Sequence, residues 1–369
     1  MTYPTAKTGI LKTKPYVGGD VNPSGVPRRI GLSSNENPLG PSPKAIKAMQ
    51  EALPKAHLYP SGAANDLRQA IAKHHDIEPT NIVCGGGSED LLKQIISCYT
   101  APGDEVLFSH YSFRLYFISA HCADAVPVMV PAPNYVPDVD EILNAVTPKT
   151  KVVLIDNPAN PIGGYIPFSE VKRLHAGLPS DVVLVLDGAY AEYMQGYEEF
   201  DAGSQMVEEF ENVVMTRTFS KFYGLAGVRV GWCYAPDHMC EILNRNRLPF
   251  AANGLAQPAA IASLQDTEYA KQVLGQHTDT LQRFMGDLNS LGLEYINSVT
   301  NFVLVRFPDL TSQNAKNAYD YFTNIGISTR PVAGYDLPKW LRISLGTDDQ
   351  MKTFVQELDK FLNTRRASA

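Results

Sequence analysis

The sequence lacks the features of several protein classes. No run of about 18 uncharged apolar residues occurs, so a membrane-spanning helix is not expected. The 369 residues include 39 Asp and Glu against 32 Lys and Arg, and the charge of −7 provides no basic surface for nucleic acid or an anionic membrane. Residues 1–7 contain no basic stretch followed by an apolar one. We therefore expect a soluble, cytoplasmic protein that acts on small molecules.

Cysteine pairs and metal-ligand spacings are missing as well. The five cysteines lie far apart, and no Cys-x-x-Cys pair occurs. None of the eight histidines stands at a ligand spacing from another His or Cys, and the neighbours His74 and His75 fall on adjacent faces of a predicted helix. This pattern favours reduced core thiols over a disulfide framework, and it predicts no metal site.

The chain does contain, between about residues 80 and 235, short apolar segments that alternate with longer amphipathic stretches. Such alternation is typical of a buried, mostly parallel sheet with crossover helices, and it predicts a doubly wound α/β core. The predicted strands span residues 82–84, 105–108, 151–156, 182–187, 212–216 and 228–233. The predicted helices span residues 44–52, 66–75, 89–99, 138–145 and 169–176.

The pattern changes beyond about residue 265 to that of a smaller α+β domain. We predict helices at 268–291, at 313–324 and from 348, and strands at 301–306 and 340–345. A chain of this length exceeds one ordinary core, so we expect a large domain over 46–265 and a small domain over 266–369. Residues 1–45 would form an N-terminal arm and part of the small domain. We expect the arm to pack on another surface, such as a partner subunit, although a flexible tail fits the composition almost as well.

Residues 217–232 combine an amine, two hydroxyls and a guanidinium with small and apolar neighbours. The amine of Lys221 is easier to deprotonate beside apolar surface, and it could then form a Schiff base with an aldehyde. The hydroxyls of Thr218 and Ser220 and the guanidinium of Arg229 suit a phosphate dianion. Pyridoxal 5′-phosphate (PLP) carries both groups. From these residues alone, a solvated loop lysine and an ordinary surface arginine remain an alternative.

This segment resembles the Schiff-base lysine segment of fold-type I, class II aminotransferases, and almost every position matches their histidinol-phosphate aminotransferase branch. The resemblance extends from residues 9–11 to the Leu-Arg-Ile strand near the end of the chain. It implies a PLP enzyme in which Lys221 is the Schiff-base lysine and proton shuttle. It also implies that Thr218, Ser220 and Arg229 surround the cofactor phosphate.

Polar segments follow several predicted strands, at the sheet edge where open α/β sheets bind ligands. Residues 84–90 form a glycine-rich turn that enters a helix and could hold a phosphate, although tight-turn geometry alone would also require glycine. The resemblance assigns the backbone amides of Ser88 and Glu89 to the cofactor phosphate.

The loop at residues 156–164 contains two Asn-Pro pairs, which turn chemistry alone could explain. It resembles the family's Asn-Pro-x-Asn-Pro-Thr-Gly loop, and this implies that Asn160 donates to the pyridine 3-oxygen. Ile162 replaces the usual threonine and removes a hydroxyl from the loop.

Asp187 ends a strongly apolar predicted strand, where an acid is costly unless it meets donors or a cation. It could be a structural cap or a counter-ion, and the resemblance makes it the partner of the protonated pyridine nitrogen. Tyr190 would donate to the 3-oxygen. Phe113, in residues 110–116, would stack on the pyridine ring, although most aromatics near a sheet belong to the core.

Four further residues lie outside the predicted central sheet. Tyr59 matches the family's Tyr-Pro motif, which implies contact with the neighbouring subunit's cofactor and substrate in a homodimer with shared sites; an exposed loop aromatic is the alternative. Asn35 would lie near the substrate mouth, where Asn160 would also contact substrate. Arg330 and Arg342 could be surface charges, but by resemblance Arg342 binds the substrate carboxylate or phosphate, and Arg330 is the second anion contact.

The implied reaction is ping-pong transamination of L-histidinol phosphate with 2-oxoglutarate, giving imidazole-acetol phosphate and L-glutamate in histidine biosynthesis. Residues 250–253 depart from a stretch where relatives often place an asparagine directly after the aromatic, so phenylalanine or tyrosine is the leading rival amino donor. A phosphothreonine-type decarboxylase and a PLP-binding regulatory domain are weaker alternatives.

Overall fold

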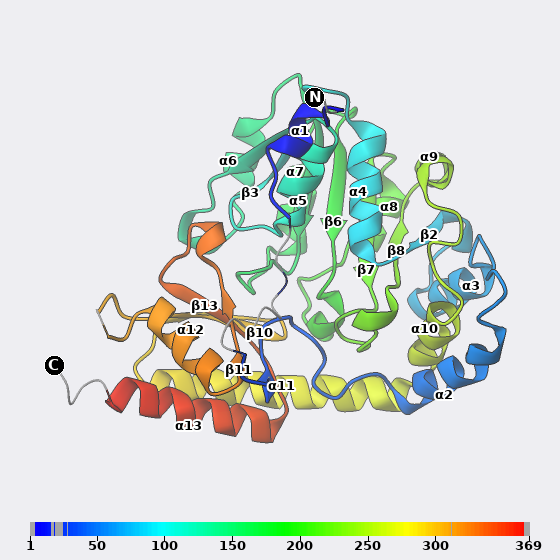
Figure 1. The fold of residues 1–369 in the computed structure, drawn as a ribbon. Coiled ribbons are helices and arrows are strands. Elements are labelled where there is room, and N and C mark those ends of the chain that lie inside the picture. The colour runs from blue at the N-terminus through cyan, green and yellow to red at the C-terminus, as the bar shows by residue number, and fades with distance from the viewer. Residues whose placement is uncertain (1–3, 16–17, 19–24, 28, 311, 365–369) are drawn as a thin grey trace. The chain divides into compact units, whose positions relative to one another are not determined.

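The computed structural model describes residues 4–15, 18, 25–27, 29–310 and 312–364 (Figure 1). The chain divides into two compact units. Unit 1 contains Met1–Pro15, Pro41–Asn160 and Tyr165–Thr267, and unit 2 contains Tyr16–Gly40, Pro161–Gly164 and Glu268–Ala369. Part of the predicted N-terminal arm lies outside the described residues.

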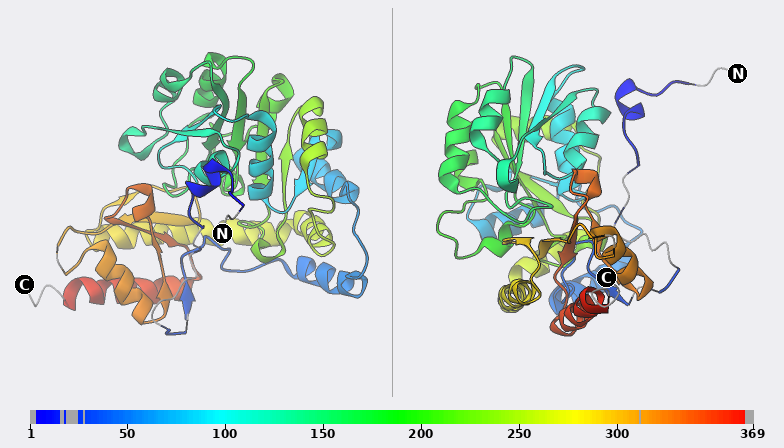
Figure 2. Two further views of the ribbon diagram at one scale, coloured as in Figure 1. Left: turned by 45° about the horizontal axis from the view of Figure 1, so that its top comes forward. Right: turned by 90° about the vertical axis from the view of Figure 1, so that its left-hand side faces the viewer.

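Unit 1 is built on a seven-stranded sheet with the order β2-β8-β7-β6-β5-β3-β4. Only β8 runs antiparallel to its neighbours, so the predicted doubly wound, mostly parallel sheet is confirmed. Helices cover both faces of this sheet (Figures 1 and 2). The strands are β2 (Ile82–Gly85), β3 (Glu105–Ser109), β4 (Val126–Val130), β5 (Thr150–Asp156), β6 (Val183–Asp187), β7 (Val213–Thr218) and β8 (Gly231–Tyr234).

The helices of unit 1 include all five that the sequence predicts. Those five are α2 (Pro43–Ala52), α3 (Asn65–His75), α4 (Ser88–Tyr99), α6 (Val139–Ala145) and α7 (Phe168–Gly177). The sequence prediction omitted α1 (Thr8–Leu11), α5 (Leu115–Cys122), α8 (Ser204–Glu209), α9 (Asp237–Asn246) and α10 (Ala256–Gln265). The predicted strand at 228–233 starts too early, because residues 226–228 form a 3-10 turn and Arg229 has a positive φ of 57°.

The central strands of unit 1 are continuous apolar runs because helices bury them on both faces. Val152, Leu154, Val185 and Val214 are fully buried in this core. Polar side chains first become possible where the strands end, and this places Asp156, at the end of β5, at the carboxyl edge of the sheet.

Unit 2 contains a four-stranded antiparallel sheet, β12-β13-β10-β9, and a two-stranded parallel pair, β1-β11. Its aromatic core includes Phe284, Phe322, Phe354 and Phe361. The strands are β1 (Ile30–Gly31), β9 (Tyr295–Ile296), β10 (Phe302–Arg306), β11 (Ile327–Ser328), β12 (Arg330–Pro331) and β13 (Trp340–Ser344). The helices are α11 (Thr267–Ser290), α12 (Ala315–Asn324) and α13 (Asp348–Thr364).

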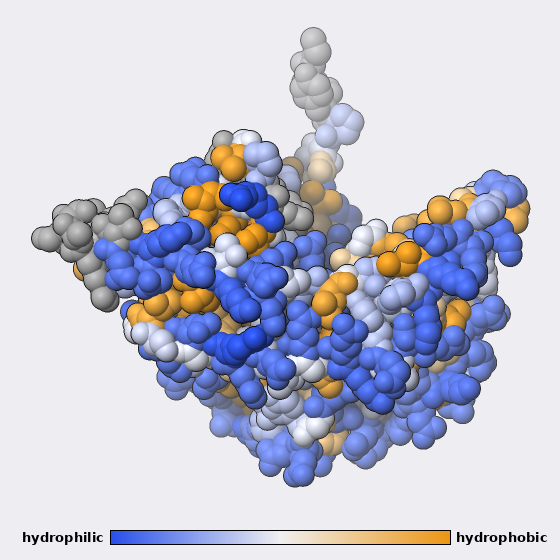
Figure 3. All heavy atoms as spheres, turned by 90° about the horizontal axis from the view of Figure 1, so that it is seen from below, coloured by the Kyte–Doolittle hydropathy of each residue, from blue (hydrophilic) through white to orange (hydrophobic). Residues whose placement is uncertain are grey.

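The described helices include none that is both long enough and apolar enough to cross a bilayer. The surface in Figure 3 is mostly hydrophilic, with separate apolar patches. All five cysteines are free thiols, and the described residues contain no cluster of His, Cys, Asp and Glu that could hold a metal ion.

Candidate active site

Three strands of unit 1 place polar side chains at one edge of the sheet. In the parallel register, Asp156 of β5 lies opposite Asp187 of β6, and Asp187 lies opposite Thr216 of β7. Residues in register on adjacent strands project to the same face. The structure therefore brings together two buried carboxyls that are far apart in the sequence.

Asp187 is only 3% exposed and accepts hydrogen bonds from two neutral donors. The Tyr116 hydroxyl donates to Oδ2 (2.8 Å), and the Thr216 hydroxyl donates to Oδ1 (3.1 Å). Burial raises the pKa of Asp187 to about 6, while the two hydroxyls favour the ionised form. Among the described residues no Lys or Arg forms an ion pair with it, so this buried carboxylate suits a cationic ligand.

Tyr116 had no predicted role, but the structure places it beside Asp187. It is fully buried on the first turn of α5, with its ring edge-on to Phe113 at 6.0 Å. Burial and the nearby carboxyls raise its pKa well above the usual value, so its hydroxyl remains a donor to Asp187. Its role could not be found from the sequence, because it depends on α5, which was not predicted, and on the approach of α5 to β6.

Asp156 is the second residue that the sequence analysis left without a role. Its Oδ2 accepts hydrogen bonds from the backbone N–H groups of Asn160 (2.9 Å) and Phe113 (3.3 Å). The Asn157 side chain closes the same loop by bonding to both backbone groups of Ile166. Asn160 is buried, which suits a side-chain amide held in a fixed direction.

Ile162, which replaces the family's threonine, is buried. The departure therefore exchanges a hydroxyl for an apolar side chain that is removed from water.

The segment that carries Lys221 begins where β7 ends. The Thr218 hydroxyl donates to Ser220 Oγ (2.9 Å) and accepts from the Ser220 backbone N–H (3.1 Å). Phe219 and Phe222 are buried on either side, and Lys221 itself is half-buried. This anchoring differs from that of a fully solvated loop lysine.

The glycine-rich turn leads into the N-terminus of α4. Gly87, with a φ of 104°, is the N-cap residue and provides no side-chain cap, so the first amides of α4 stay available to an anion. The Gly231 position permits a close approach, because a Cβ there would lie 2.4 Å from the Ser88 nitrogen. A Cβ on Gly87 would lie 2.7 Å from Arg229 Nη2. The structure thus brings the start of α4 and Arg229 together.

Arg229 also reaches Glu89, with Nη2 3.2 Å from Oε2. Both side chains are about half exposed, so this ion pair contributes little stability and can rearrange around an anion.

The remaining aromatic candidates in unit 1 differ in burial. Tyr190 is buried just after β6, and Phe113 is half-buried. Tyr59 is 83% exposed and stacks on Phe250, with ring centroids 4.6 Å apart and an interplanar angle of 22°. An exposed tyrosine fits either a contact with a second subunit or a simple loop aromatic.

Unit 2 carries the other candidates. Arg330 and Arg342 lie directly opposite each other on β12 and β13. Two like charges at such positions repel, so the pair suits an anion. Arg342 is only 7% exposed, with its guanidinium 5.2 Å from the Phe302 ring and Nη2 2.7 Å from the Ser33 carbonyl, which excludes a mere surface charge.

Asn35 is also buried in unit 2, with a left-handed φ of 55°. Its backbone N–H donates to Ser344 Oγ (2.9 Å), whose hydroxyl donates back to Asn35 Oδ1 (2.9 Å). Its position next to the Arg342 strand is therefore fixed.

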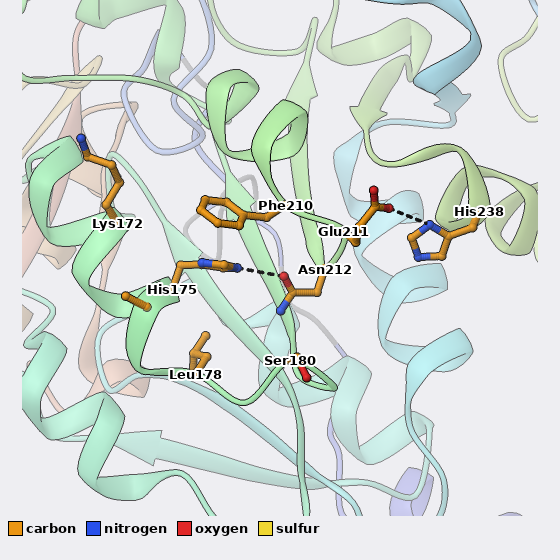
Figure 4. A pocket seen from close by; sticks show the side chains of 9 residues that line it. Lys172, His175, Leu178, Ser180, Phe210, Glu211, Asn212 and His238 are labelled. Carbon is orange, nitrogen blue, oxygen red and sulfur yellow. Dashed lines mark hydrogen bonds and ion pairs between the residues drawn. The ribbon is translucent and has the colours of Figure 1, made fainter.

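A separate pocket of about 550 Å³ lies near the amino ends of β6 and β7, at the opposite edge of the sheet (Figure 4). His175 bonds to Asn212 Oδ1 (2.8 Å) there, and His238 lies 3.3 Å from Glu211 Oε2. None of the predicted site residues lines this pocket.

Comparisons with known proteins agree with this geometry. Residues 27–358 match the family described as aminotransferase class I and II. The chain is 42% identical over 362 residues to a histidinol-phosphate aminotransferase of Paramagnetospirillum magneticum, covering 98% of this chain and 99% of the relative. It is 43% identical to a histidinol-phosphate aminotransferase of Ruegeria, covering 98% of both chains. A crystal structure of the Sinorhizobium meliloti histidinol-phosphate aminotransferase with PLP is similar at a TM-score of 0.89 and 28% identity, covering 97% of this chain and 98% of that one.

Proposed function

The chain belongs to the class I and II aminotransferase family, and on that premise we propose that it is a PLP-dependent histidinol-phosphate aminotransferase. It transfers the amino group of L-histidinol phosphate to 2-oxoglutarate. The observation that carries the substrate assignment is 42% identity to a histidinol-phosphate aminotransferase over nearly the full length of both chains.

The residues at the carboxyl edge of the unit 1 sheet fit the cofactor. The uncapped start of α4 and the adjacent Arg229 suit its phosphate, the half-buried Lys221 suits its aldehyde, and the buried Asp187 suits its pyridinium nitrogen. When bound, PLP supplies the electron sink that makes the proton on the substrate's amine-bearing carbon acidic.

We assign each side chain one task in this chemistry. Asp187 holds the proton on the ring nitrogen, while Tyr116 and Thr216 keep the carboxylate ionised. Lys221 Nζ removes the proton from the amine-bearing carbon and returns a proton later. The donors to the 3-oxygen are Asn160 and Tyr190, and Phe113 orients the ring by stacking. The phosphate ligands are Thr218, Ser220, Arg229 and the amides of Ser88 and Glu89.

Substrate binding falls to Arg330, Arg342 and Asn35. The cross-strand arginine pair binds the carboxylate of glutamate or the phosphate of histidinol phosphate, because a guanidinium fork accepts either anion. Tyr59 contacts the active site of a second subunit, so the functional unit that we propose is a homodimer with shared sites. The exposure of Tyr59 supports this role.

A substrate comparison tests the proposal. Purified protein incubated with PLP should turn over histidinol phosphate with 2-oxoglutarate at a kcat/KM about a hundredfold or more above that for phenylalanine. Double-reciprocal plots should be parallel, as ping-pong kinetics require. A preference for phenylalanine would favour the aromatic aminotransferase. Release of carbon dioxide from phosphothreonine without a keto acid would favour the decarboxylase.

Lys221→Ala tests the assignment of the lysine. The variant should lose about 10³-fold or more in kcat, because no other group is assigned to move the proton. Borohydride treatment should attach PLP covalently to the wild type but not to the variant. Lys172→Ala, at the opposite edge of the sheet, is the matched control and should behave like the wild type. Covalent labelling of the Lys221→Ala variant would show that another lysine binds the coenzyme.

A further inference from the structure

Asp156 is a buried carboxyl that the proposed chemistry leaves without a task. It is 4% exposed, and no described Lys or Arg forms an ion pair with it. An isolated buried carboxylate is costly, so a position that retains one requires a physical reason.

One oxygen of Asp156 joins two segments that approach the cofactor. Asn160 belongs to the loop after β5, whereas Phe113 belongs to the turn before α5, and both backbone N–H groups point at Oδ2. A carboxylate is a stronger acceptor than a neutral oxygen and can serve both donors at once. The proposed 3-oxygen donor and the proposed stacking ring are thereby fixed to one atom.

Asp156 also lies next to Asp187 in the sheet register, on the same face. Burial, followed by the neighbouring Asp187 carboxylate, raises the pKa of Asp156 to about 7. The amide of Asn160 and the hydroxyl of Ser112 act in the opposite direction. The Tyr116 hydroxyl of α5 is also close to it and stays neutral. Two adjacent buried carboxyls repel each other when both are ionised, so they favour the binding of a cation close to both.

We propose that Asp156 is a positioning residue of the cofactor pocket, which fixes Asn160 and Phe113 beside Asp187 and adds a second negative charge that stabilises the cationic form of bound PLP. This inference rests on the proposed function. The positive charge of the bound cofactor lowers the pKa of Asp156 and so favours its ionised form in the holoenzyme.

Two substitutions separate the hydrogen bonds from the charge. Asp156→Asn keeps an oxygen that can accept from both backbone N–H groups but cannot ionise, whereas Asp156→Ala removes acceptor and charge together. Asp181→Asn is the matched control. Asp181 lies just before the amino end of β6, where it is exposed and pairs with Lys151, so this substitution also removes one carboxylate.

The experiment measures the PLP dissociation constant by equilibrium dialysis and the pH midpoint of the bound-cofactor absorbance. At a pH above the absorbance midpoints, Asp156→Ala should bind PLP about tenfold more weakly, and Asp156→Asn within about twofold of the wild type. Both variants should shift the absorbance midpoint down by about one pH unit, because the cationic form loses a nearby negative charge. Asp181→Asn should change neither value.

Wild-type affinity in Asp156→Ala would overturn the positioning role, and an unshifted midpoint in Asp156→Asn would overturn the charge role. If Asp156→Ala does not fold, the pH midpoint of the near-isosteric Asp156→Asn variant still tests the charge role. If the wild type binds and uses PLP and the Asp156 variants behave like it, this inference is refuted while the proposed function stands. A wild-type protein that binds no PLP refutes the proposed function as well.

Discussion

The hydroxyl of Tyr116 controls how easily Asp187 takes up a proton. Its hydrogen bond favours the ionised carboxylate, so Tyr116→Phe should raise the pKa of Asp187 above its present value of about 6. The pH below which the apoenzyme loses affinity for PLP should then move up by about half to one unit, because a protonated Asp187 cannot pair with the cationic ring nitrogen. PLP titrations of the apoenzyme across the acid range measure this shift.

A matched control for Tyr116→Phe is Tyr99→Phe at the end of α4. The Tyr99 hydroxyl is buried and makes no hydrogen bond within the described part of the chain. Its removal should leave the pH profile unchanged. Equal profiles for the two variants would mean that Tyr116 does not act through Asp187.

Asp156 should also make the stability of the apoenzyme fall as pH rises. Its pKa is raised from 3.8 to about 7, so between those values the folded protein keeps a proton that the unfolded chain has released. Folding is therefore opposed by up to about 1.4 kcal/mol for each pH unit in this window, and the penalty is complete above it. Asp156→Asn removes the penalty.

Urea unfolding of the two apoenzymes checks this sign. The Asp156→Asn variant should gain stability relative to the wild type from about pH 5 to about pH 8, and most of the gain should appear below about pH 7. Asp187 titrates in both proteins, and without the neighbouring Asp156 charge its carboxyl ionises more easily, which adds to the gain at the higher pH values. A difference that does not change with pH would show that Asp156 is ionised throughout this range.

The elements of the fold could be predicted where the hydrophobic pattern was strong. The buried strands β5, β6 and β7 are continuous apolar runs with polar ends, and helices α4 and α7 are amphipathic. Strand β4 was missed because it is partly exposed at the sheet edge and contains a proline. Helix α5 was missed because its sequence is apolar on most faces and lacks a helical period.

The candidate site shows the same division. Motifs predicted roles for residues that follow the strands, such as Asn160 and Asp187, because their order along the chain is part of the motif. The partners Tyr116 and Asp156 could not be assigned, since their contacts depend on the sheet register and on a helix that pattern analysis omitted. Arg330 and Arg342 likewise become cross-strand neighbours only when β12 pairs with β13.

The contact between β8 and α4 depends on the absence of a side chain at Gly231. A Cβ there would meet three backbone atoms, at 2.4 Å from Ser88 N, 2.6 Å from Gly87 C and 2.9 Å from Arg217 O, and backbone cannot move aside easily. Gly231→Ala should therefore cost about 1–3 kcal/mol of stability and displace the start of α4 from Arg229. The affinity for PLP should fall with it.

Urea unfolding and PLP titration of Gly231→Ala test this contact. Gly275→Ala in α11 is the control, because a Cβ there meets nothing within 4 Å and alanine favours a helix. The control should be as stable as the wild type or slightly more stable. If Gly231→Ala matches the Gly275→Ala control in stability and in PLP affinity, the close contact at Gly231 does not hold the start of α4 in place.

The similarity to histidinol-phosphate aminotransferases covers the chain almost from end to end, so both units take part in the function that we propose. Unit 1 carries the residues that we assign to the cofactor, and unit 2 carries the cross-strand arginine pair that we assign to anionic substrates. Neither unit accounts for Tyr59, whose ring is exposed apart from its contact with Phe250. The homodimer that we propose would give this residue a task.

Mixed dimers test whether sites are shared. Lys221→Ala and Tyr59→Ala should each be impaired alone, because each defect affects both sites of a homodimer. When the two variants are unfolded, mixed in equal amounts and refolded, half of the dimers should be mixed. If Tyr59 serves the neighbouring site, both defects fall in one site of a mixed dimer and the other site is intact. Activity should then rise to about a quarter of the refolded wild-type value. If Tyr59 serves its own subunit, every site keeps one defect and the mixture shows only the average of the two variants.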